Sequence, residues 1–402
     1  MGERRRGRIK AFQVGTPTEI VDLKFRHYER GDEAGLAEVF VRAFQTNGAS
    51  GVRTRKSWHW RYAERPGFEP EAVQVCVDGD AGGRVVGMVG AEVHECLVGG
   101  RRVLSGSIND VSTDPAYARR GIARRLLEMA ERHFDERGVA FSKLTADPRG
   151  HARERLYLPA GYRDFVREAI LFQLSSLGRL AFQQVPLLLP ALPAMVALKF
   201  LTLWSRGWAL RAGGAKFACE VVENPTNRQF EEFRKFLDRL GRRRYDWWVP
   251  LTREEWNWRY RAVPAPRFRR SFVTLRVADE LAAVAILHVQ NVYSFKLGLK
   301  VKLAVITEFL HDRRAFGGRA EELAATSGAL LQLVRVAAKR GASALLCLRP
   351  LNDAFVVDNF RRAGMVVLPA GSVVMVKKRD ETLELDPRRP FHLPAQDAFG
   401  TP

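Results

Sequence analysis

Hydrophobic residues recur along this chain with two different periods. In one set of segments apolar and β-branched residues alternate or run together between glycine-rich turns, which is typical of strands. From residue 23 to 175 these predicted strands are 23–28, 72–78, 84–100, 101–113, 140–147 and 165–174. In the other set apolar residues return every three or four positions, which is typical of helices packed along one face. The predicted helices in the same region are 33–44, 121–137 and 151–158.

The pattern then repeats in the second half of the chain. "SWHWRYAERP" (57–66) resembles "EWNWRYRAVP" (255–264), and both segments keep Trp-x-Trp-Arg-Tyr with a proline four residues later. Gly138 and Gly341 are separated by 203 positions, as are Gly161 and Gly364. One shared spacing across two landmarks indicates two copies of one fold. The predicted fold class is therefore α/β (α+β): two tandem domains, each a mixed, mostly antiparallel twisted sheet flanked by helices.

Five regions follow from these patterns. They are a basic N-terminal arm (1–22), a first domain (23–175), an apolar, proline-containing insertion or linker (176–215), a second domain (216–380) and an extended C-terminal tail (381–402).

The stretch 177–210 differs from the rest of the chain. Between Val185 and Trp204 the only charge is Lys199, and Pro186, Pro190 and Pro193 interrupt the first part. Three interpretations stay open: a buried insertion between the domains, a peripheral membrane hairpin, and a membrane span, against which the prolines and Lys199 argue.

Charge narrows the classes of partner. The 402 residues carry 65 Lys and Arg against 45 Asp and Glu, a formal charge of +20. Such a field favours anionic partners, among them nucleotide cofactors, nucleic acid and anionic membrane surfaces. The four cysteines are far apart and form no CxxC pair, so neither a zinc site nor a disulfide framework is expected. With no apolar run behind the basic start of the chain, a cytoplasmic protein is predicted.

The segment around Gly121 has the composition of an anion site. "DVSTDPAYARRGIARRL" places a predicted strand, a Pro115 turn and an Arg-Arg-Gly loop directly before a helix. The first N–H groups of a helix lack partners within the helix, and its dipole favours negative charge there. Glycine lets a ligand approach the backbone. We therefore expect a pyrophosphate at this loop.

These residues resemble motif A of the GNAT superfamily of acyl-coenzyme A-dependent N-acetyltransferases. The resemblance rests on Thr113-Asp114-Pro115 followed by "ARRGIA" (118–123), and on Tyr157 ahead of Gly161-Tyr162 in "LYLPAGY". It covers about residues 23–175. The "DVxTxPxYxRRG" pattern is also similar to that of tandem acetyltransferases related to enhanced-intracellular-survival proteins. Ala118, where the family usually has Gln or Arg, and Gly150, where an asparagine often stands, depart from the family pattern.

The resemblance implies a cosubstrate and roles. Acetyl-CoA would bind without a metal, and its pantetheine arm would bond to the backbone of Val111, Ser112 and Thr113. Its pyrophosphate would lie on the amides of Arg119, Arg120, Gly121, Ile122, Ala123 and Arg124. Tyr157 would protonate the departing thiolate, which is sound acid catalysis.

The general base stays open at this point. Asp110, on the motif A strand, is the first choice. Glu92, His94, His59 and a water relay are the alternatives.

The second copy departs from the motif. The 203 spacing places Glu321, Ala324 and Thr326 over Ala118, Gly121 and Ala123, and Phe360 over Tyr157. A copy without the glycine and without the hydroxyl is expected to be inactive. Its own Trp-x-Trp-Arg-Tyr segment is expected to pack under a loop, with Arg61 and Arg259 in ion pairs, or else to contact the acceptor.

The predicted function is N-acetyl transfer from acetyl-CoA to a primary amine on a small molecule or peptide. Two other classes stay open: an aminoacyl-tRNA-dependent transferase acting on a peptidyl or lipid acceptor, and a non-catalytic acyl-CoA-binding module. The intact loop argues against the first, so a nucleic-acid partner is not favoured. The protein is expected in the cytoplasm, and in the peripheral interpretation at the inner face of the membrane through residues 177–210.

Overall fold

A computed structural model describes residues 22–45, 54–177, 217–263, 270–294 and 299–392, together with short pieces between 179 and 201. We call residues 22–177 the first half and 217–378 the second half. Most of the predicted N-terminal arm, much of the apolar stretch and residues 393–402 of the predicted tail lie outside the described residues.

The strands and helices of the first half follow the predicted order. The strands are β1 (Leu23–His27), β2 (Val73–Asp78), β3 (Arg84–Val98), β4 (Arg101–Thr113), β5 (Phe141–Ala146) and β6 (Arg163–Leu174). The helices are α1 (Glu33–Gln45), α2 (Arg55–Arg61) and α3 (Ile122–Glu136), with a 3-10 turn η2 (Pro115–Tyr117) and a π-helical turn η3 (Arg153–Tyr157). The apolar face predicted for residues 121–137 is the buried face of α3, where Ile122, Leu126, Ala130 and Phe134 are at most 1% exposed.

The second half runs through a matching set of elements. The strands are β7 (Phe217–Val222), β8 (Trp247–Trp248), β9 (Ser271–Val277), β10 (Glu280–Ser294), β11 (Leu299–His311), β12 (Ala344–Pro350) and β13 (Val366–Lys378). The helices are α5 (Asn227–Arg244), α6 (Arg253–Tyr260), α7 (Arg319–Lys339) and α8 (Ala354–Arg362), with a 3-10 turn η7 (Arg313–Ala315).

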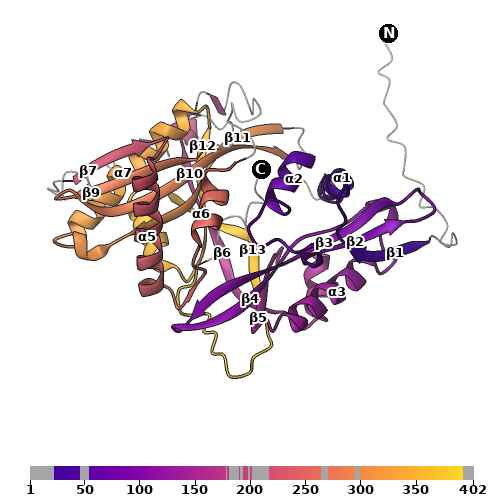
Figure 1. The fold of residues 1–402 in the computed structure, drawn as a ribbon. Coiled ribbons are helices and arrows are strands. Elements are labelled where there is room, and N and C mark those ends of the chain that lie inside the picture. Colours follow the sequence, from indigo (N-terminus) through magenta and orange to yellow (C-terminus); the bar gives the residue numbers. More distant parts are fainter. Residues whose placement is uncertain are drawn as a thin grey trace, which may run out of the picture.

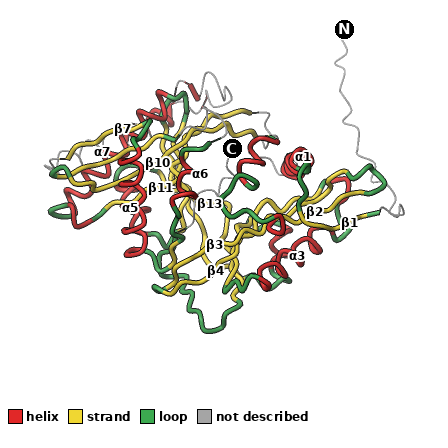
Figure 2. Tube along the Cα trace, in the orientation of Figure 1, coloured by secondary structure: helices red, strands yellow, loops and turns green. Residues whose placement is uncertain are grey.

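The described strands form one continuous sheet of 13 strands through both halves (Figures 1 and 2). Its order is β1-β2-β3-β4-β5-β13-β6-β12-β11-β10-β9-β7, with β8 on the far end of β3. The predicted fold class, a mixed and mostly antiparallel sheet flanked by helices, is confirmed.

The two halves exchange their last strands. The strand β6 does not pair with β5 of its own half but with β12 of the other, in antiparallel register from Glu168–Pro350 to Leu174–Ala344. In the same way β13 does not pair with β12 of its own half. It pairs with β5 of the other half, from Phe141–Lys378 to Ala146–Val373. The two exchanged strands also pair with each other in the middle of the sheet (Figure 1). The sequence pattern placed residues 165–174 as the last strand of the first domain, whereas in the fold β6 links the two halves.

The repeated Trp-x-Trp-Arg-Tyr segments meet where the halves join. They form α2 and α6, and the rings of Trp60 and Trp258 stack with centroids 5.2 Å apart. The Trp258 indole N–H donates to the backbone carbonyl of Trp60 at 2.8 Å. Both tryptophans are buried, so this contact is part of the packing between the halves.

The described pieces of the apolar stretch can be compared with the three interpretations given above. Met195 packs beside the buried pair Leu174 and Leu180. On the same short segment Val196, Phe200 and Leu201 are 51%, 64% and 59% exposed. A wholly buried insertion does not fit these exposures. No helix in the described part of the chain is long and apolar enough to cross a membrane.

Candidate active site

The site begins where two neighbouring parallel strands separate. The strands β4 and β5 pair only at Ser105–Phe141, Gly106–Ser142 and Ser107–Lys143. Further along, a β-bulge between Met88 and Gly90 shifts the register of β3 against β4. Bulges bend a strand and increase its twist, which turns the end of β4 away from β5.

This separation leaves a narrow cleft between the strands. Its walls are Ser107, Ile108, Asn109, Lys143, Leu144, Thr145 and Val374. Because β4 has no partner strand on this side beyond Ser107, the backbone of Val111, Ser112 and Thr113 can bond to a ligand along the β5-facing edge. These are the three residues that the resemblance assigns to the pantetheine arm.

The segment Arg119–Arg124, which we call the amide loop, forms the N-terminal end of α3. Gly121 is the N-cap residue, with a φ of 77°, and no side chain caps the helix. Arg119 also has a positive φ of 64°. Among the described residues no acceptor is recorded for the backbone amides of the loop, and the first turn of α3 contains no acidic residue. A row of unsatisfied N–H groups at a positive helix end is a preformed anion site.

Charged side chains fix the approach to this loop. The buried Asp114 carboxylate accepts from the amide of Ala116 at 3.0 Å and from Arg42 at 3.1 Å. These bonds hold the Thr-Asp-Pro turn that ends β4. On the outer side of the loop lies a cavity of about 620 Å³, lined by Asp22, Leu23, Phe25, Asp80, Arg120, Gly121 and Arg125.

Tyr157 ends the π-helical turn η3 and is 7% exposed. It belongs to the hydrophobic cluster under α3 that includes Ile108 and Ile122, with Val111 packed against it. The structure thus brings together the predicted acid, the strand end and the amide loop. No hydrogen-bond partner for the Tyr157 hydroxyl is recorded among the described residues, and burial raises its pKa. The hydroxyl therefore stays protonated at neutral pH and can donate.

Asp110, the first-choice base, is held in place by two residues of the repeated Trp-x-Trp-Arg-Tyr segment, Tyr62 and Arg61. The Asp110 carboxylate, on the bulged part of β4 with a φ of 51°, accepts from the Tyr62 hydroxyl at 2.8 Å. It also lies 3.4 Å from the Arg61 Nε. The second half repeats this pair, since the Tyr260 hydroxyl donates to Glu308 at 3.0 Å.

Of the other candidate bases, Glu92 and His94 lie together, whereas His59 lies elsewhere. Glu92 pairs with Arg65 at 2.8 Å and lies 3.4 Å from the His94 Nε2. Burial alone would raise the pKa of Glu92, but Arg65 and the hydrogen bond with His94 outweigh burial and lower it. His59 instead lies 3.7 Å from Glu33 and 3.8 Å from Glu64, so it points to another part of the surface.

Sequence patterns missed several residues of this site. Tyr62 was noticed only as part of a repeat, and Ser107, Asn109 and Lys143 only as members of strands. Alternation along β4 and β5 would have placed these three on one face, but nothing in the sequence shows that the strands separate there. The Asp-Pro pair at Asp114 is a recognisable turn signal.

Among the described residues of the second half, no segment is equivalent to the amide loop. The helix α7 has 21 residues where α3 has 15, and its N-cap residue is Gly318. The true counterpart of Gly121 is therefore Gly318 and not Ala324, because the 203 spacing holds only after the start of the helix. The residues Glu321, Ala324 and Thr326 all lie inside α7.

Carboxylates occupy the N-terminal end of α7. Glu321 accepts from the amide of Gly317 at 2.6 Å. Glu322, which is buried, accepts from Arg319 at 2.9 Å and from Asn359 at 3.0 Å and lies 2.7 Å from the His311 Nε2. Phe360 stands at the position of Tyr157 and is fully buried. An anionic ligand would meet negative charge here.

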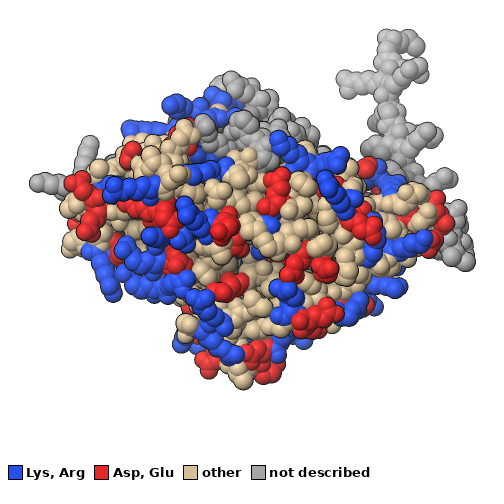
Figure 3. All heavy atoms as spheres, viewed as in Figure 1, with Lys and Arg blue, Asp and Glu red and all other residues tan. Residues whose placement is uncertain are grey.

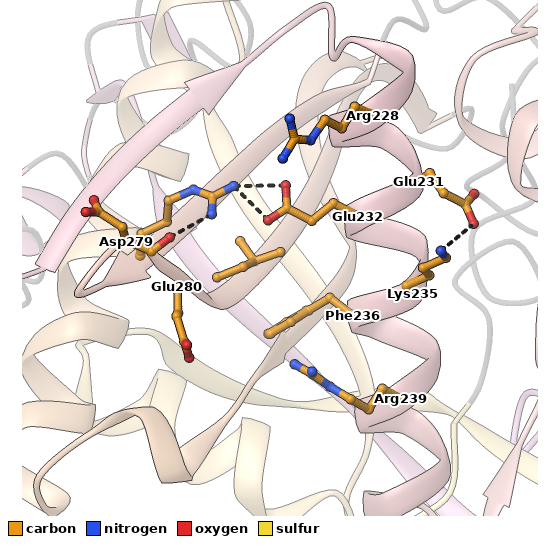
Figure 4. Close-up of a pocket in the computed structure, with 10 residues that line it drawn as sticks. Arg228, Glu231, Glu232, Lys235, Phe236, Arg239, Asp279 and Glu280 are labelled. Carbon is orange, nitrogen blue, oxygen red and sulfur yellow. Dashed lines mark hydrogen bonds and ion pairs between the residues drawn. The ribbon is translucent and has the colours of Figure 1, made fainter.

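A larger open cavity lies in the second half but has a different character. It lies between α5 and the β9–β10 hairpin (Figure 4). Its charged walls carry both signs, and Glu232 binds Arg276 through both oxygens at 2.9 and 3.0 Å. Because the carboxylates of Glu231, Glu232, Asp279 and Glu280 line the same cavity, it does not favour an anionic cofactor as the amide loop does.

Comparison with known proteins agrees with this geometry. Residues 24–164 match the family described as acetyltransferase (GNAT) domain. The fold is similar to that of Saccharomyces cerevisiae N-myristoyltransferase with bound myristoyl-CoA, with a TM-score of 0.63 and 10% identity over 90% of this chain and 84% of that one. It is also similar to a GCN5-related N-acetyltransferase from Anabaena variabilis ATCC 29413, with a TM-score of 0.51 and 12% identity over 88% of this chain and 72% of that one. No curated protein sequence matches the chain significantly.

Proposed function

We propose that this chain, whose residues 24–164 match the acetyltransferase (GNAT) domain family, transfers an acetyl group from acetyl-CoA to a primary amine. The observation that carries the proposal is the amide loop. Its backbone N–H groups have no recorded acceptor among the described residues and lie at the end of a strand that separates from its neighbour.

The chain's own residues divide the work of binding. The amide loop would hold the pyrophosphate, with Arg119, Arg120 and Arg124 adding positive charge. The free edge of β4 at Val111–Thr113 would hold the pantetheine arm, which directs the thioester into the cleft beside Ser107 and Leu144.

Transfer is direct in this proposal. The amine nitrogen attacks the thioester carbonyl, the C–S bond breaks, and the Tyr157 hydroxyl gives its proton to the departing thiolate. The amine loses a proton to Asp110, directly or through a water molecule. Tyr62 and Arg61 keep the Asp110 carboxylate in place.

The two alternative classes predict different features. A tRNA-dependent enzyme needs a continuous basic track, but on the face drawn in Figure 3 acidic side chains are interspersed among the basic ones. Many basic side chains of the described residues are in ion pairs, for example Arg276 with Glu232. A non-catalytic binding module would bind acetyl-CoA without turnover on any amine.

We also propose that the apolar segment touches an anionic membrane surface. Val196, Phe200 and Leu201 are exposed together, and the sequence around them carries Arg179, Lys199, Arg206 and Arg211. Exposed apolar side chains flanked by cations are typical of peripheral membrane segments.

The first experiment is calorimetric titration of acetyl-CoA into the wild type and the Gly121→Glu variant. A carboxylate at the N-cap of α3 opposes the pyrophosphate, so we expect micromolar binding by the wild type and a loss of at least about tenfold, ~1.4 kcal/mol, in the variant. Gly318→Glu changes the matching N-cap of α7 and should leave binding unchanged. The Gly121→Ala variant adds a side chain at the positive φ but no charge, so it separates the effect of backbone strain on binding from the effect of charge. Equal binding by Gly121→Glu and the wild type would refute the assignment of the loop.

A further inference from the structure

Arg270 and His288 lie next to each other in the sheet of the second half. Arg270, which directly precedes β9, and His288 on β10 are 2% and 1% exposed. The register of β9 with β10 places Ser271 opposite Leu287, and one further position brings Arg270 opposite His288. Cross-strand neighbours point to the same face of a sheet. That face is covered by α5 and α6, because Phe272, two residues after Arg270, belongs to the hydrophobic cluster of these helices.

Polar atoms of this pair lack partners. The Arg270 Nε and Nη1 and the His288 Nδ1 have no hydrogen-bond partner among the described residues, whereas the His288 Nε2 lies 3.2 Å from the Gln290 Oε1. Buried polar groups are nearly always hydrogen-bonded, and buried charges are nearly always paired. A buried guanidinium without a carboxylate therefore points to an anion that completes the site.

The charged groups around Arg270 do not supply this anion. Among the described residues its titratable neighbours are Arg259 and Tyr260, and burial, together with the charge of Arg259, lowers the pKa of the Arg270 guanidinium to about 10. At neutral pH the group is therefore still positively charged. The carboxylate of Glu308 accepts from the Tyr260 hydroxyl at 3.0 Å and lies 2.9 Å from the His392 Nε2. Glu308 is thus committed to other partners.

The repeated fold does not need a charge at the position of Arg270. The spacing of 198 between the two Trp-x-Trp-Arg-Tyr segments matches Arg270 with Ala72, which directly precedes β2 as Arg270 precedes β9. The first half thus enters the same strand with a methyl group. The guanidinium is an addition in the second half, and packing alone gives no reason for a buried charge there.

The rest of the chain offers few counter-charges. The segments beside the pair, 264–269 and 295–298, contain no Asp or Glu. Outside the described ranges the acidic residues of the sequence are Glu3, Glu19 and Asp397. The anion at Arg270 is therefore either one of these three carboxylates or a ligand.

We propose that Arg270 and His288 form a binding site for a carboxylate ligand, separate from the amide loop. A carboxylate carries one negative charge, as one uncompensated guanidinium requires, and its oxygens accept from the Arg270 N–H groups. The ligand also favours the protonated form of His288, whose Nδ1–H then donates to it. The inference does not rest on the proposed function, because no residue of the amide loop takes part.

The test follows thermal unfolding of the full chain in added anions. Sodium acetate, sodium pyruvate and sodium benzoate are compared with sodium phosphate and with sodium chloride at equal ionic strength. We expect at least one carboxylate to raise Tm in a saturable way beyond chloride, and Arg270→Met to abolish this rise. In chloride alone Arg270→Met should raise Tm, because it removes an uncompensated buried charge. Should this variant not fold, Arg270→Lys, which loses the guanidinium N–H groups, should increase the half-saturating concentration at least tenfold.

The matched control is Arg276→Met. Arg276 lies on the same strand but binds Glu232 through both oxygens, at 2.9 and 3.0 Å. This variant should lower Tm or leave it unchanged, and it should keep the response to carboxylates. A response that survives Arg270→Met, the absence of a response to any anion, or a phosphate response as large as that to the carboxylates would overturn the proposal.

Neutralising the acids outside the described ranges separates a ligand from the chain itself. We expect the triple variant Glu3→Gln, Glu19→Gln, Asp397→Asn to respond to carboxylates as the wild type does. If it gains a response that the wild type lacks, the chain's own carboxylate fills the site and the ligand is ruled out. Acetyl-CoA affinity should be unchanged in Arg270→Met. Failure of the proposed function therefore appears separately, as absent acetyl-CoA binding in the wild type.

Discussion

At the residue scale the proposed mechanism depends on the Tyr157 hydroxyl, which is buried but has no recorded partner among the described residues. Tyr162, close by, has its hydroxyl bound to Glu131 at 2.7 Å and to Ser142 at 2.8 Å, which suits a structural role. Tyr157 has no such bond recorded and borders the same cluster as the strand end and the amide loop. Of these two neighbouring tyrosines, only Tyr157 has a hydroxyl available for a departing thiolate.

Replacing this hydroxyl gives a direct test. Tyr157→Phe should lower kcat by about 100-fold, the lower end of the range for general acids, because a thiolate is already a good leaving group. Since burial raises the pKa of Tyr157 above its usual value of about 10, the acid form persists at working pH. We therefore expect kcat of the wild type to show no alkaline decline from this group below about pH 10. Steady-state kinetics across pH measure both effects, and acetyl-CoA affinity should not change. An unchanged kcat in Tyr157→Phe would remove this residue from the mechanism.

At the element scale the same turn and helix occur twice, but the charges at the start of the helix are opposite in sign. The helix α3 starts with arginines and open amides, whereas α7 starts with Glu321 and Glu322. Acidic residues in the first turn stabilise a helix by complementing its dipole. The second copy thus uses its helix start for stability, while the first leaves its own available to an anion.

This difference predicts a pH dependence of stability. Burial opposes ionisation of Glu322, but hydrogen bonds with His311, Arg319 and Asn359 outweigh it and lower the pKa of its carboxyl to about 2. A group with a lowered pKa contributes stability above its unfolded pKa of about 4.3, and this contribution is lost as the pH falls towards the folded value. Glu322→Gln should lower Tm at pH 7, and the gap to the wild type should narrow between about pH 4.3 and 2. Thermal unfolding followed by circular dichroism measures the Tm of both proteins at each pH. A difference in Tm that stays constant with pH would contradict the lowered pKa of Glu322.

At the scale of the whole molecule the halves are tied together through backbone pairing. The exchanged strands β6 and β13 each pair with the opposite half and with each other. The stacked Trp60 and Trp258 add a second link. The degenerate half therefore supplies part of the sheet beside the cleft, including the wall residue Val374.

Membrane contact is the other property that belongs to the molecule as a whole. Sedimentation with vesicles of phosphatidylcholine and phosphatidylglycerol should recover the wild type, and the double variant Phe200→Glu, Leu201→Glu should lose most of this binding. The matched control is Leu351→Glu with Leu368→Glu, which alters leucines that are 45% and 41% exposed elsewhere in the fold. Pure phosphatidylcholine and high salt should both weaken the wild type's binding, because the cations contribute about 1 kcal/mol each near an anionic surface. Equal losses in the two double variants, or no vesicle binding by the wild type, would exclude this segment as a membrane contact.

Local patterns determined the element order of this protein, its fold class and the amide loop. These features depend on contacts close in sequence: the spacing of apolar residues on α3, the turn at Pro115 and the glycine that begins the helix. The likeness between 57–66 and 255–264 also identified the two helices that meet at Trp60 and Trp258. The domain boundaries and the assignment of acetyl-CoA stay predictions.

Tertiary structure alone decided the strand exchange, the partners of Asp110 and the cleft between β4 and β5. Each brings together residues distant in the chain, such as Tyr62 with Asp110 or Lys143 with Ser107. A periodic pattern shows which face of a strand is apolar, but it does not show which strand lies beside it, because β6 and β13 satisfy the same pattern in either half. The bulge that separates β4 from β5, and with it the cleft, depends on that choice of neighbours.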